Sequence, residues 1–248
     1  LAIHEELSAA EPGNLNARLQ VARGWHALAG ALVNLDDFTG MLDSRRRALA
    51  IYKELAEAEP KNKVYQRNLA LGYKYLGGIL GKLGSYAESL ESYQAALAID
   101  EALLAASPDS TETRMDVSFD LSDIGYIHWQ TGKLPQALSL YRRALGIRED
   151  LATADPKDVR VRGSLATTLE RMGSIQSAMG DSAAALRQIH RALALREPLA
   201  RSDTANVSNQ FALAGTYKAL GDVHSSLAKA RQQAASWQEA RSWYRRGL

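Results

Sequence analysis

The sequence of 248 residues contains no cysteine and only six prolines. Without cysteine, the chain has no disulfide bond, no thiolate nucleophile and no cysteine-based metal site. It also lacks an uninterrupted apolar run of about 18 residues, which argues against a membrane-spanning helix. No basic segment followed by an apolar one opens the chain. The first residue is Leu1 rather than Met, which indicates a processed or excised piece.

Neither sign of charge is in large excess, because 30 basic residues face 28 acidic ones and the net charge is +2. A surplus this small does not attract nucleic acid unless it is clustered, and we expect no nucleic-acid partner. The hydrophobic fraction of 46% is too high for a disordered chain. The composition therefore predicts a chain with a packed core.

The few prolines that are present reveal a repeat. Pro12, Pro60, Pro108 and Pro156 follow one another at intervals of 48 residues. A fixed period of this kind is the sequence signature of repeat architectures. The third position of successive blocks, for example, holds Ile3, Ile51, Ile99, Ile147 and Leu195.

The period predicts one array over residues 1–248 without a domain boundary. Its blocks are 1–48, 49–96, 97–144, 145–192 and 193–248. The last block carries about seven inserted residues near 228–236. Seven residues are about two helical turns, so the insertion keeps the buried face of a helix in phase.

Within each block the apolar residues follow helical spacing. We expect two helices of about 20 residues, separated by a break at Gly84, Gly132 or Gly180, where glycine suits a left-handed turn. Asn62 and Asp158 follow their prolines and are expected to cap the next helix. The predicted fold class is all-α, a right-handed α-solenoid of antiparallel helix pairs.

The blocks resemble tetratricopeptide repeats, whose pattern places large residues, a Leu-Gly pair, an aromatic residue and alanine before a proline. In the second block these positions hold Tyr73, Leu76, Gly77, Ser89, Tyr93, Ala96 and Pro108. The ordinary repeat has about 34 residues, so these repeats are lengthened. The phrases within Leu49 to Pro60 are similar to repeat regions attached to bacterial serine/threonine kinases.

The resemblance implies that the first helix of each pair lines a concave groove that holds a protein or peptide segment. The third block fills the groove positions with bulky residues, and the second block places smaller ones beside them. The candidate partner-binding residues are Met115, Phe119, Ser122, Asp123, Tyr126, Trp129, Lys74, Tyr75 and Gly78. An aromatic platform of this type suits an interaction hot spot. The third block carries seven acidic and four basic residues, which favours a partner with apolar and basic residues.

Packing is the alternative role for these aromatic residues. Tyr126 and Trp129 would then fill space over Gly78 and Gly81 of the neighbouring helix, since helical aromatic stripes are commonly core. Removal of both rings distinguishes the two interpretations. Loss of binding with an intact fold favours the groove, and collapse of the fold favours packing.

No catalytic, cofactor or metal site is expected. The five histidines never occur four residues apart with a carboxylate between them, so no zinc-hydrolase helix is present. The glycines between Gly77 and Gly84 lack the spacing of a phosphate-binding loop. Lys74 and Lys218 lack the asparagines of a carboxylate clamp. The basic group Arg45 to Arg47 recurs with the repeat and is expected on a solvated face.

The predicted function is therefore a non-catalytic scaffold that binds a protein or peptide in the groove. The alternative is a regulatory or sensor module of a larger bacterial signalling enzyme, such as a serine/threonine kinase. Self-association through the solenoid ends is a further alternative, because open ends expose apolar faces. We expect the cytoplasm as the compartment, or the periplasm if the region belongs to a membrane-anchored receptor kinase.

Overall fold

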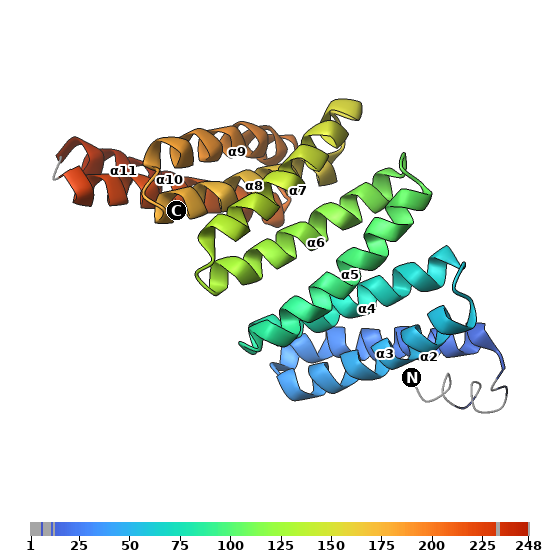
Figure 1. Cartoon of the computed structure of the whole chain (residues 1–248). Helices are drawn as coiled ribbons and strands as arrows, with labels where there is room; N and C mark the ends of the chain where they lie inside the picture. The colour runs from blue at the N-terminus through green and yellow to red at the C-terminus, as the bar shows by residue number, and fades with distance from the viewer. Residues whose placement is uncertain (1–5, 7–10, 12, 232–233, 248) are drawn as a thin grey trace. The chain divides into compact units, whose positions relative to one another are not determined.

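The computed structural model describes residues 6, 11, 13–231 and 234–247, and this part of the chain contains helices and turns but no strand. Consecutive helices fold back on one another through short connections (Figure 1). The helices are α2 (Leu15–Leu32), α3 (Phe38–Ala58), α4 (Lys63–Lys82), α5 (Tyr86–Ala106), α6 (Thr111–Gln130), α7 (Leu134–Ala154), α8 (Val159–Ala178), α9 (Ser182–Ser202), α10 (Val207–Arg231) and α11 (Ala234–Arg246), with a 3-10 helix at Val33–Leu35.

The helix bounds follow the period of the sequence. The first helices α4, α6, α8 and α10 each begin 48 residues after the previous one, and so do the second helices α5, α7 and α9. From α4 to α9 the first helices have 20 residues and the second helices 21. The prediction of two helices of about 20 residues in each block is confirmed for these pairs.

The turns form for the reasons that the sequence indicates. The Asn62 side chain accepts hydrogen bonds from the backbone N–H groups of Val64 and Tyr65, and Asp158 accepts one from Val161. These bonds satisfy donors that the first turn of a helix otherwise leaves unpaired. At the break inside each pair, Gly84, Gly132 and Gly180 have φ angles of 78°, 75° and 86°, which confirms the left-handed turn.

The insertion in the last block lengthens a helix. The first helix α10 has 25 residues, whereas α4, α6 and α8 each have 20. The inserted segment at 228–236 therefore continues α10 as far as Arg231 and includes the start of α11 at Ala234. Residues 232 and 233, between these helices, lie outside the described residues, as do Leu1, Ile3, Pro12 and Leu248.

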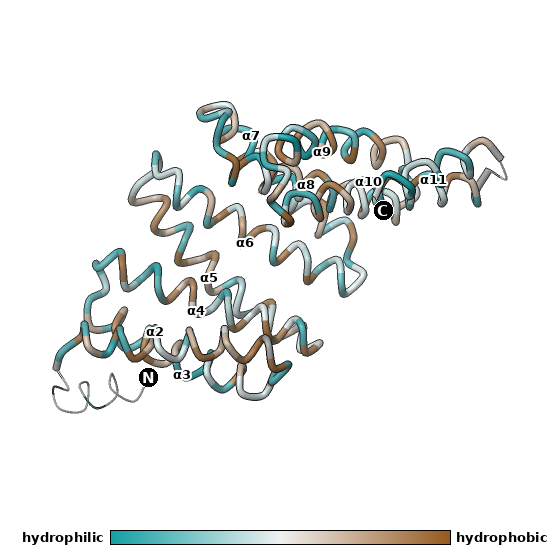
Figure 2. The backbone as a smooth tube through the Cα atoms, turned by 180° about the vertical axis from the view of Figure 1, so that it is seen from behind, coloured by the Kyte–Doolittle hydropathy of each residue, from teal (hydrophilic) through white to brown (hydrophobic). Residues whose placement is uncertain are grey.

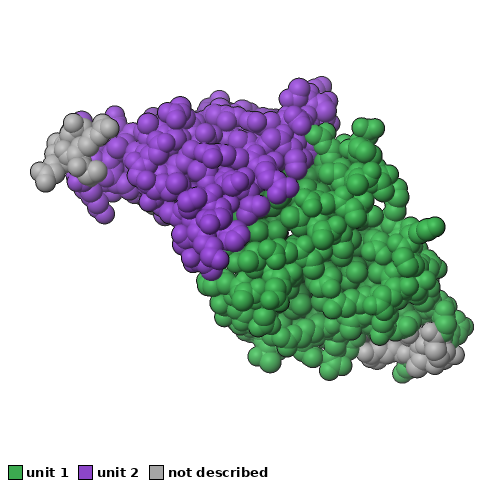
Figure 3. All heavy atoms as spheres, in the orientation of Figure 1, with its two compact units in different colours: residues 1–127 green, residues 128–248 purple. Residues whose placement is uncertain are grey.

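The chain divides into two compact units, residues 1–127 and residues 128–248 (Figure 3). The division falls within α6. The expectation of a single array without a domain boundary stays a prediction.

Each unit has its own apolar core, and hydrophobic segments, brown in Figure 2, alternate with hydrophilic ones, in teal, along the helices. In unit 1, α2, α3 and α4 enclose a cluster that includes Leu19, Tyr52 and Leu55. In unit 2, clusters form between α7 and α8, between α8 and α9, and among α9, α10 and α11. None of the described helices is long and apolar enough to span a membrane.

Glycine permits the close approach of paired helices in both units. A Cβ atom added at Gly173 would lie 2.5 Å from Ile189 Cγ1, and one added at Gly221 would lie 2.5 Å from the Tyr244 ring. Both distances are far below van der Waals contact, so the second helix could not pack this closely against any larger residue. Glycine at positions 173 and 221 is therefore fixed by packing, whereas the equivalent position of the first pair holds Ala29.

Candidate functional site

Exposed tyrosine side chains lie on each of the first helices α4 and α6 of unit 1. Tyr75 of α4 is 40% exposed and Tyr126 of α6 is 38% exposed. Phe119, Ser122 and Asp123 lie half-buried on the same side of α6 as Tyr126, since their spacing follows the helical turn. We call Tyr75, Gly78, Phe119, Ser122, Asp123 and Tyr126 the aromatic face.

Two predicted groove residues do not contribute to this surface. Met115 is only 1% exposed, so its side chain belongs to the packed interior, where a long apolar group is most stable. The side chain of Lys74 is 11% exposed, and its ammonium is turned toward two buried carboxylates. For Met115 and Lys74 the prediction of contact with a partner is therefore wrong.

Trp129 belongs to unit 2 and packs there. Its ring lies against the cluster that includes Leu138, Tyr141 and Met172, and the Arg171 guanidinium lies 5.4 Å from the ring centroid. Burial of an aromatic ring against apolar neighbours stabilises the fold. The packing interpretation thus applies to Trp129.

The same interpretation does not account for Tyr126. A Cβ at Gly78 would meet the Tyr93 hydroxyl at 3.4 Å, and one at Gly81 would meet Ile127 Cδ1 at 3.2 Å. Tyr93 and Ile127, rather than Tyr126, therefore fill the space over these glycines. The Tyr126 ring remains on the surface.

Tyr75 of α4 is held in place by side chains of α2 and α3. Its ring contacts His26 of α2 edge-on, with 4.3 Å between ring centroids, and the Arg45 guanidinium of α3 lies 4.4 Å from the Tyr75 centroid. Arg45 also donates to His26 Nδ1 at 2.6 Å. Burial and the nearby Arg45 charge lower the pKa of His26 to about 4, so this imidazole is neutral at pH 7 and can accept the bond. The expected solvated face is therefore found for Arg46 and Arg47, whereas Arg45 is half-buried.

A buried charge cluster of Lys74, Asp100 and Asp120 connects α4, α5 and α6. Lys74 Nζ lies 2.6 Å from Asp100 Oδ2 and 3.1 Å from Asp120 Oδ1. The Asp100 side chain is 1% exposed and the Asp120 side chain is fully buried. Charged groups removed from water this completely require close partners.

The pKa values of Asp120 and Lys74 are both raised in this cluster. Burial raises the pKa of Asp120 to about 9, although the neighbouring Lys74 ammonium lowers it. Burial alone would lower the pKa of Lys74, but Asp120 and Asp100 keep it above its ordinary value. At pH 7 the Lys74 ammonium is therefore charged, while the Asp120 carboxyl keeps its proton.

A second ion pair continues the cluster toward the surface. Arg67 of α4 binds Asp116 of α6 at 3.0 Å and also pairs with Glu112. Lys74 donates in addition to the backbone carbonyl of Asp116 at 3.4 Å. These contacts hold α4 beside α6, which places Tyr75 and Tyr126 on neighbouring helices.

Unit 2 repeats the cluster with the charges reversed. Glu170 of α8 lies 3.5 Å from Arg196 of α9 and accepts a hydrogen bond from the Thr216 hydroxyl of α10. Glu170 stands 96 residues after Lys74, Arg196 stands 96 after Asp100, and Thr216 stands 96 after Asp120. Two blocks make 96 residues, so both clusters occupy equivalent positions.

The raised pKa of Asp120 predicts how stability depends on pH. In the unfolded chain this carboxyl titrates near its ordinary pKa of 3.8, whereas in the fold it keeps its proton to about pH 9. Between these pH values the folded protein binds more protons than the unfolded chain. Its free energy of unfolding therefore falls as the pH rises through this window, by at most about 1.4 kcal/mol per pH unit. Asp120→Asn, which is neutral at every pH, is expected to flatten this fall in urea unfolding curves recorded from pH 5 to 9. An equally steep fall in the variant would contradict the assignment.

The described residues offer little for metal chemistry, since no group of three His, Asp or Glu side chains among them could hold an ion. The carboxylates of the buried charge cluster are enclosed and face a lysine. Their role in the fold is electrostatic.

Comparisons with known proteins agree with this architecture. Residues 76–103 and residues 121–152 each match a family model described as a tetratricopeptide repeat. No sequence relative was found among curated proteins.

Solved structures resemble the chain over nearly its whole length. BtubC from P. vanneervenii has a TM-score of 0.71 at 19% identity, over 99% of this chain and 84% of that one. Nearly identical TPR-like repeats from a Podosopora anserina chain give 0.59 at 14% identity, over 91% and 95%. Aspartyl phosphate phosphatase F from Bacillus subtilis gives 0.60 at 15% identity, over 93% and 59%. At such low identity these likenesses concern the fold alone. Two segments of the chain therefore match tetratricopeptide repeats, and the described part of the chain has the all-helical fold of a TPR-like α-solenoid.

Proposed function

We propose that the chain is a non-catalytic scaffold that binds a protein or peptide segment on the aromatic face. The observation that carries the proposal is the pair of exposed tyrosines, Tyr75 and Tyr126, on adjacent first helices. Exposed aromatic rings on a rigid support lose little conformational entropy on binding and are common at interaction hot spots. We further propose that the 48-residue unit is a lengthened tetratricopeptide repeat.

The chemistry of the aromatic face specifies the partner. Phe119 and the two tyrosines offer apolar area, Gly78 leaves room beside them, and the block that contains α6 carries seven acidic and four basic residues. A segment with apolar side chains and one Lys or Arg complements this arrangement. The buried charge cluster keeps α4, α5 and α6 together and so maintains the spacing of the two helices that carry the rings.

Site-specific cross-linking tests the location of the site. A photo-reactive amino acid at position 126 is expected to cross-link a partner in extracts of the source cells. Ser174, which occupies the equivalent position 48 residues later in unit 2, provides the matched control. Equal labelling of the partner from positions 126 and 174 would argue against a site on the aromatic face.

A regulatory module of a larger signalling enzyme, such as a bacterial serine/threonine kinase, is the second candidate. The phrases within Leu49 to Pro60 favour it, because they are similar to repeat regions attached to such kinases. A kinase domain encoded in the same gene would support this function. Self-association is a separate candidate, and light scattering across a range of concentrations tests it.

A further inference from the structure

The outer side of α11 differs from the equivalent side of earlier second helices. Tyr244 of α11 lies over Gly221, as Tyr93 lies over Gly77 and Ile189 over Gly173, so these residues define equivalent positions. The residue three positions before each of these side chains is Leu90 in α5, Leu186 in α9 and Arg241 in α11. An arginine therefore replaces leucine at this position of α11.

The leucine at this position packs against the next helix in the chain. In α7, Leu138 packs with Met172 and Ile175 of α8. In α9, Leu186 packs against the cluster that includes Leu220 and Val223 of α10. The surface of a second helix that surrounds this position is thus shaped to hold another helix.

On α11 this surface is exposed. Ala240 is buried and Trp243 lies in the cluster with α9 and α10, which shows the inward side of the helix. Trp237 is 46% exposed, at the position where α7 has Leu134. We call Trp237, Gln238, Arg241, Ser242 and Arg245 the outer face of α11.

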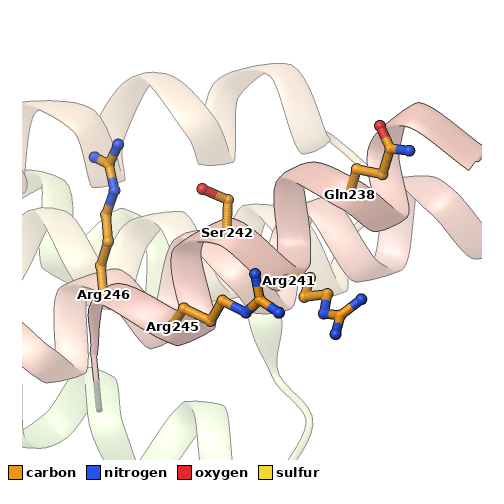
Figure 4. Close-up of a pocket in the computed structure, with 5 residues that line it drawn as sticks. All are labelled: Gln238, Arg241, Ser242, Arg245 and Arg246. Atoms are coloured by element: carbon orange, nitrogen blue, oxygen red, sulfur yellow. The ribbon is translucent and has the colours of Figure 1, made fainter.

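The charges of this face are not neutralised within the part of the chain that the structure describes. Neither Arg241 nor Arg245 has a carboxylate within ion-pair distance among the described residues. In Figure 4 the Arg245 side chain extends along α11 toward Arg241, while Arg246 points to another side, where its guanidinium lies 4.7 Å from the Trp243 ring centroid. Two like charges one helical turn apart destabilise a helix slightly, unless a partner supplies the opposite charge.

We propose that the outer face of α11 binds an acidic amphipathic helix of a partner protein. Trp237 contacts the apolar residues of that helix, and Arg241 and Arg245 pair with carboxylates spaced one turn apart on it. The position of Arg241 selects a helix as the occupant, because earlier second helices hold a helix there. The charge of Arg241 disfavours the apolar helices that pack against the leucines of earlier repeats. An apolar partner would bury the Arg241 guanidinium without a counter-charge.

The probe for this proposal is a synthetic helical peptide of about 20 residues with leucines and two glutamates, one turn apart, on the same side. Fluorescence anisotropy with the full chain measures the dissociation constant of the peptide. Tryptophan emission reports where the peptide binds: the peptide should quench the emission of the wild-type chain, and this quenching should be lost in Trp237→Phe. We expect binding that weakens with added salt, and at least about tenfold weaker binding after Arg241→Leu. The same peptide with glutamine at both glutamate positions is expected to bind the wild-type chain at least about tenfold more weakly.

Arg142→Ala is the matched control, because Arg142 follows Tyr141 of α7 as Arg245 follows Tyr244 of α11, and it is expected to leave the affinity unchanged. Arg241→Leu restores the residue of the other repeats, so its helicity and melting temperature are expected to stay at the wild-type values. Equal binding of the glutamine peptide would overturn the proposal. Equal binding of an unstructured poly-glutamate chain, or unchanged affinity of Arg241→Leu, would also overturn it.

Discussion

Replacing Lys74 by Met is expected to lower the free energy of unfolding by about 3 to 5 kcal/mol. The substitution keeps the length of the side chain and removes the only ammonium that faces Asp100 and Asp120 in the described structure. The buried Asp100 side chain then loses the cation that lies 2.6 Å from it. Urea unfolding followed by circular dichroism measures the loss.

Lys218→Met provides the control for this change. Lys218 stands at the position of α10 that Lys74 occupies in α4, yet its side chain is 70% exposed and pairs with Asp222 on the surface. A surface pair of this kind contributes about 0 to 1 kcal/mol, so the control should unfold nearly as the wild type does. Similar losses in the two variants would contradict a special role for the buried charge cluster.

Reversing the charge at Lys74 is expected to have a still larger effect. Lys74→Glu places an acid among Asp100, Asp116 and Asp120, and like charges in a buried site repel strongly. We expect a loss above about 4 kcal/mol, or failure of unit 1 to fold. Circular dichroism and limited proteolysis detect both outcomes.

A second substitution is expected to restore stability. Lys74→Glu combined with Asp100→Arg reproduces the arrangement of Glu170 and Arg196 in unit 2, and adding Asp120→Thr reproduces Thr216 as well. The combined variants should recover most of the lost free energy, with a coupling of about 2 kcal/mol or more between the two charge changes. If the combined variants are as unstable as Lys74→Glu alone, the two clusters are not equivalent.

The opposite polarities of the two clusters also oppose incorrect pairing of helices. If α4 packed against α9 in place of α5, Lys74 would face Arg196. If α8 packed against α5, Glu170 would face Asp100. Either arrangement would bury two like charges, so the correct neighbours are favoured by repulsion in the wrong ones as well as by attraction in the right ones.

The helices could be predicted from the sequence because their signals are local and repeated. Asn62 and Asp158 cap the helices that they precede, and Gly84 has the left-handed conformation that its place after a helix indicates. A residue such as Tyr86 begins its helix where the period places it. Each signal involves neighbours in the chain, and the 48-residue spacing supplies several copies of it.

Burial could not be predicted equally well, because it depends on residues of other helices. Met115 and Tyr126 lie on the same side of α6, yet the first is in the interior and the second is exposed. Lys74 was expected on the surface because its position faces the groove in related repeats, but a flexible lysine reaches carboxylates on two further helices. Comparison of equivalent positions could have revealed the cluster. The positions of Lys74 and Asp100 are occupied by Glu170 and Arg196 two blocks later, so both charges are reversed together.

The affinity of Tyr126→Ala for a captured partner tests the central proposal most directly, provided that the melting temperature of the same sample is recorded. If the aromatic face is the binding site, the dissociation constant rises by about 30-fold, which corresponds to about 2 kcal/mol for a hot-spot residue, while the melting temperature stays near that of the wild type. Unchanged affinity would contradict binding at the aromatic face. A large fall in melting temperature would contradict the separation of Tyr126 from the packed core.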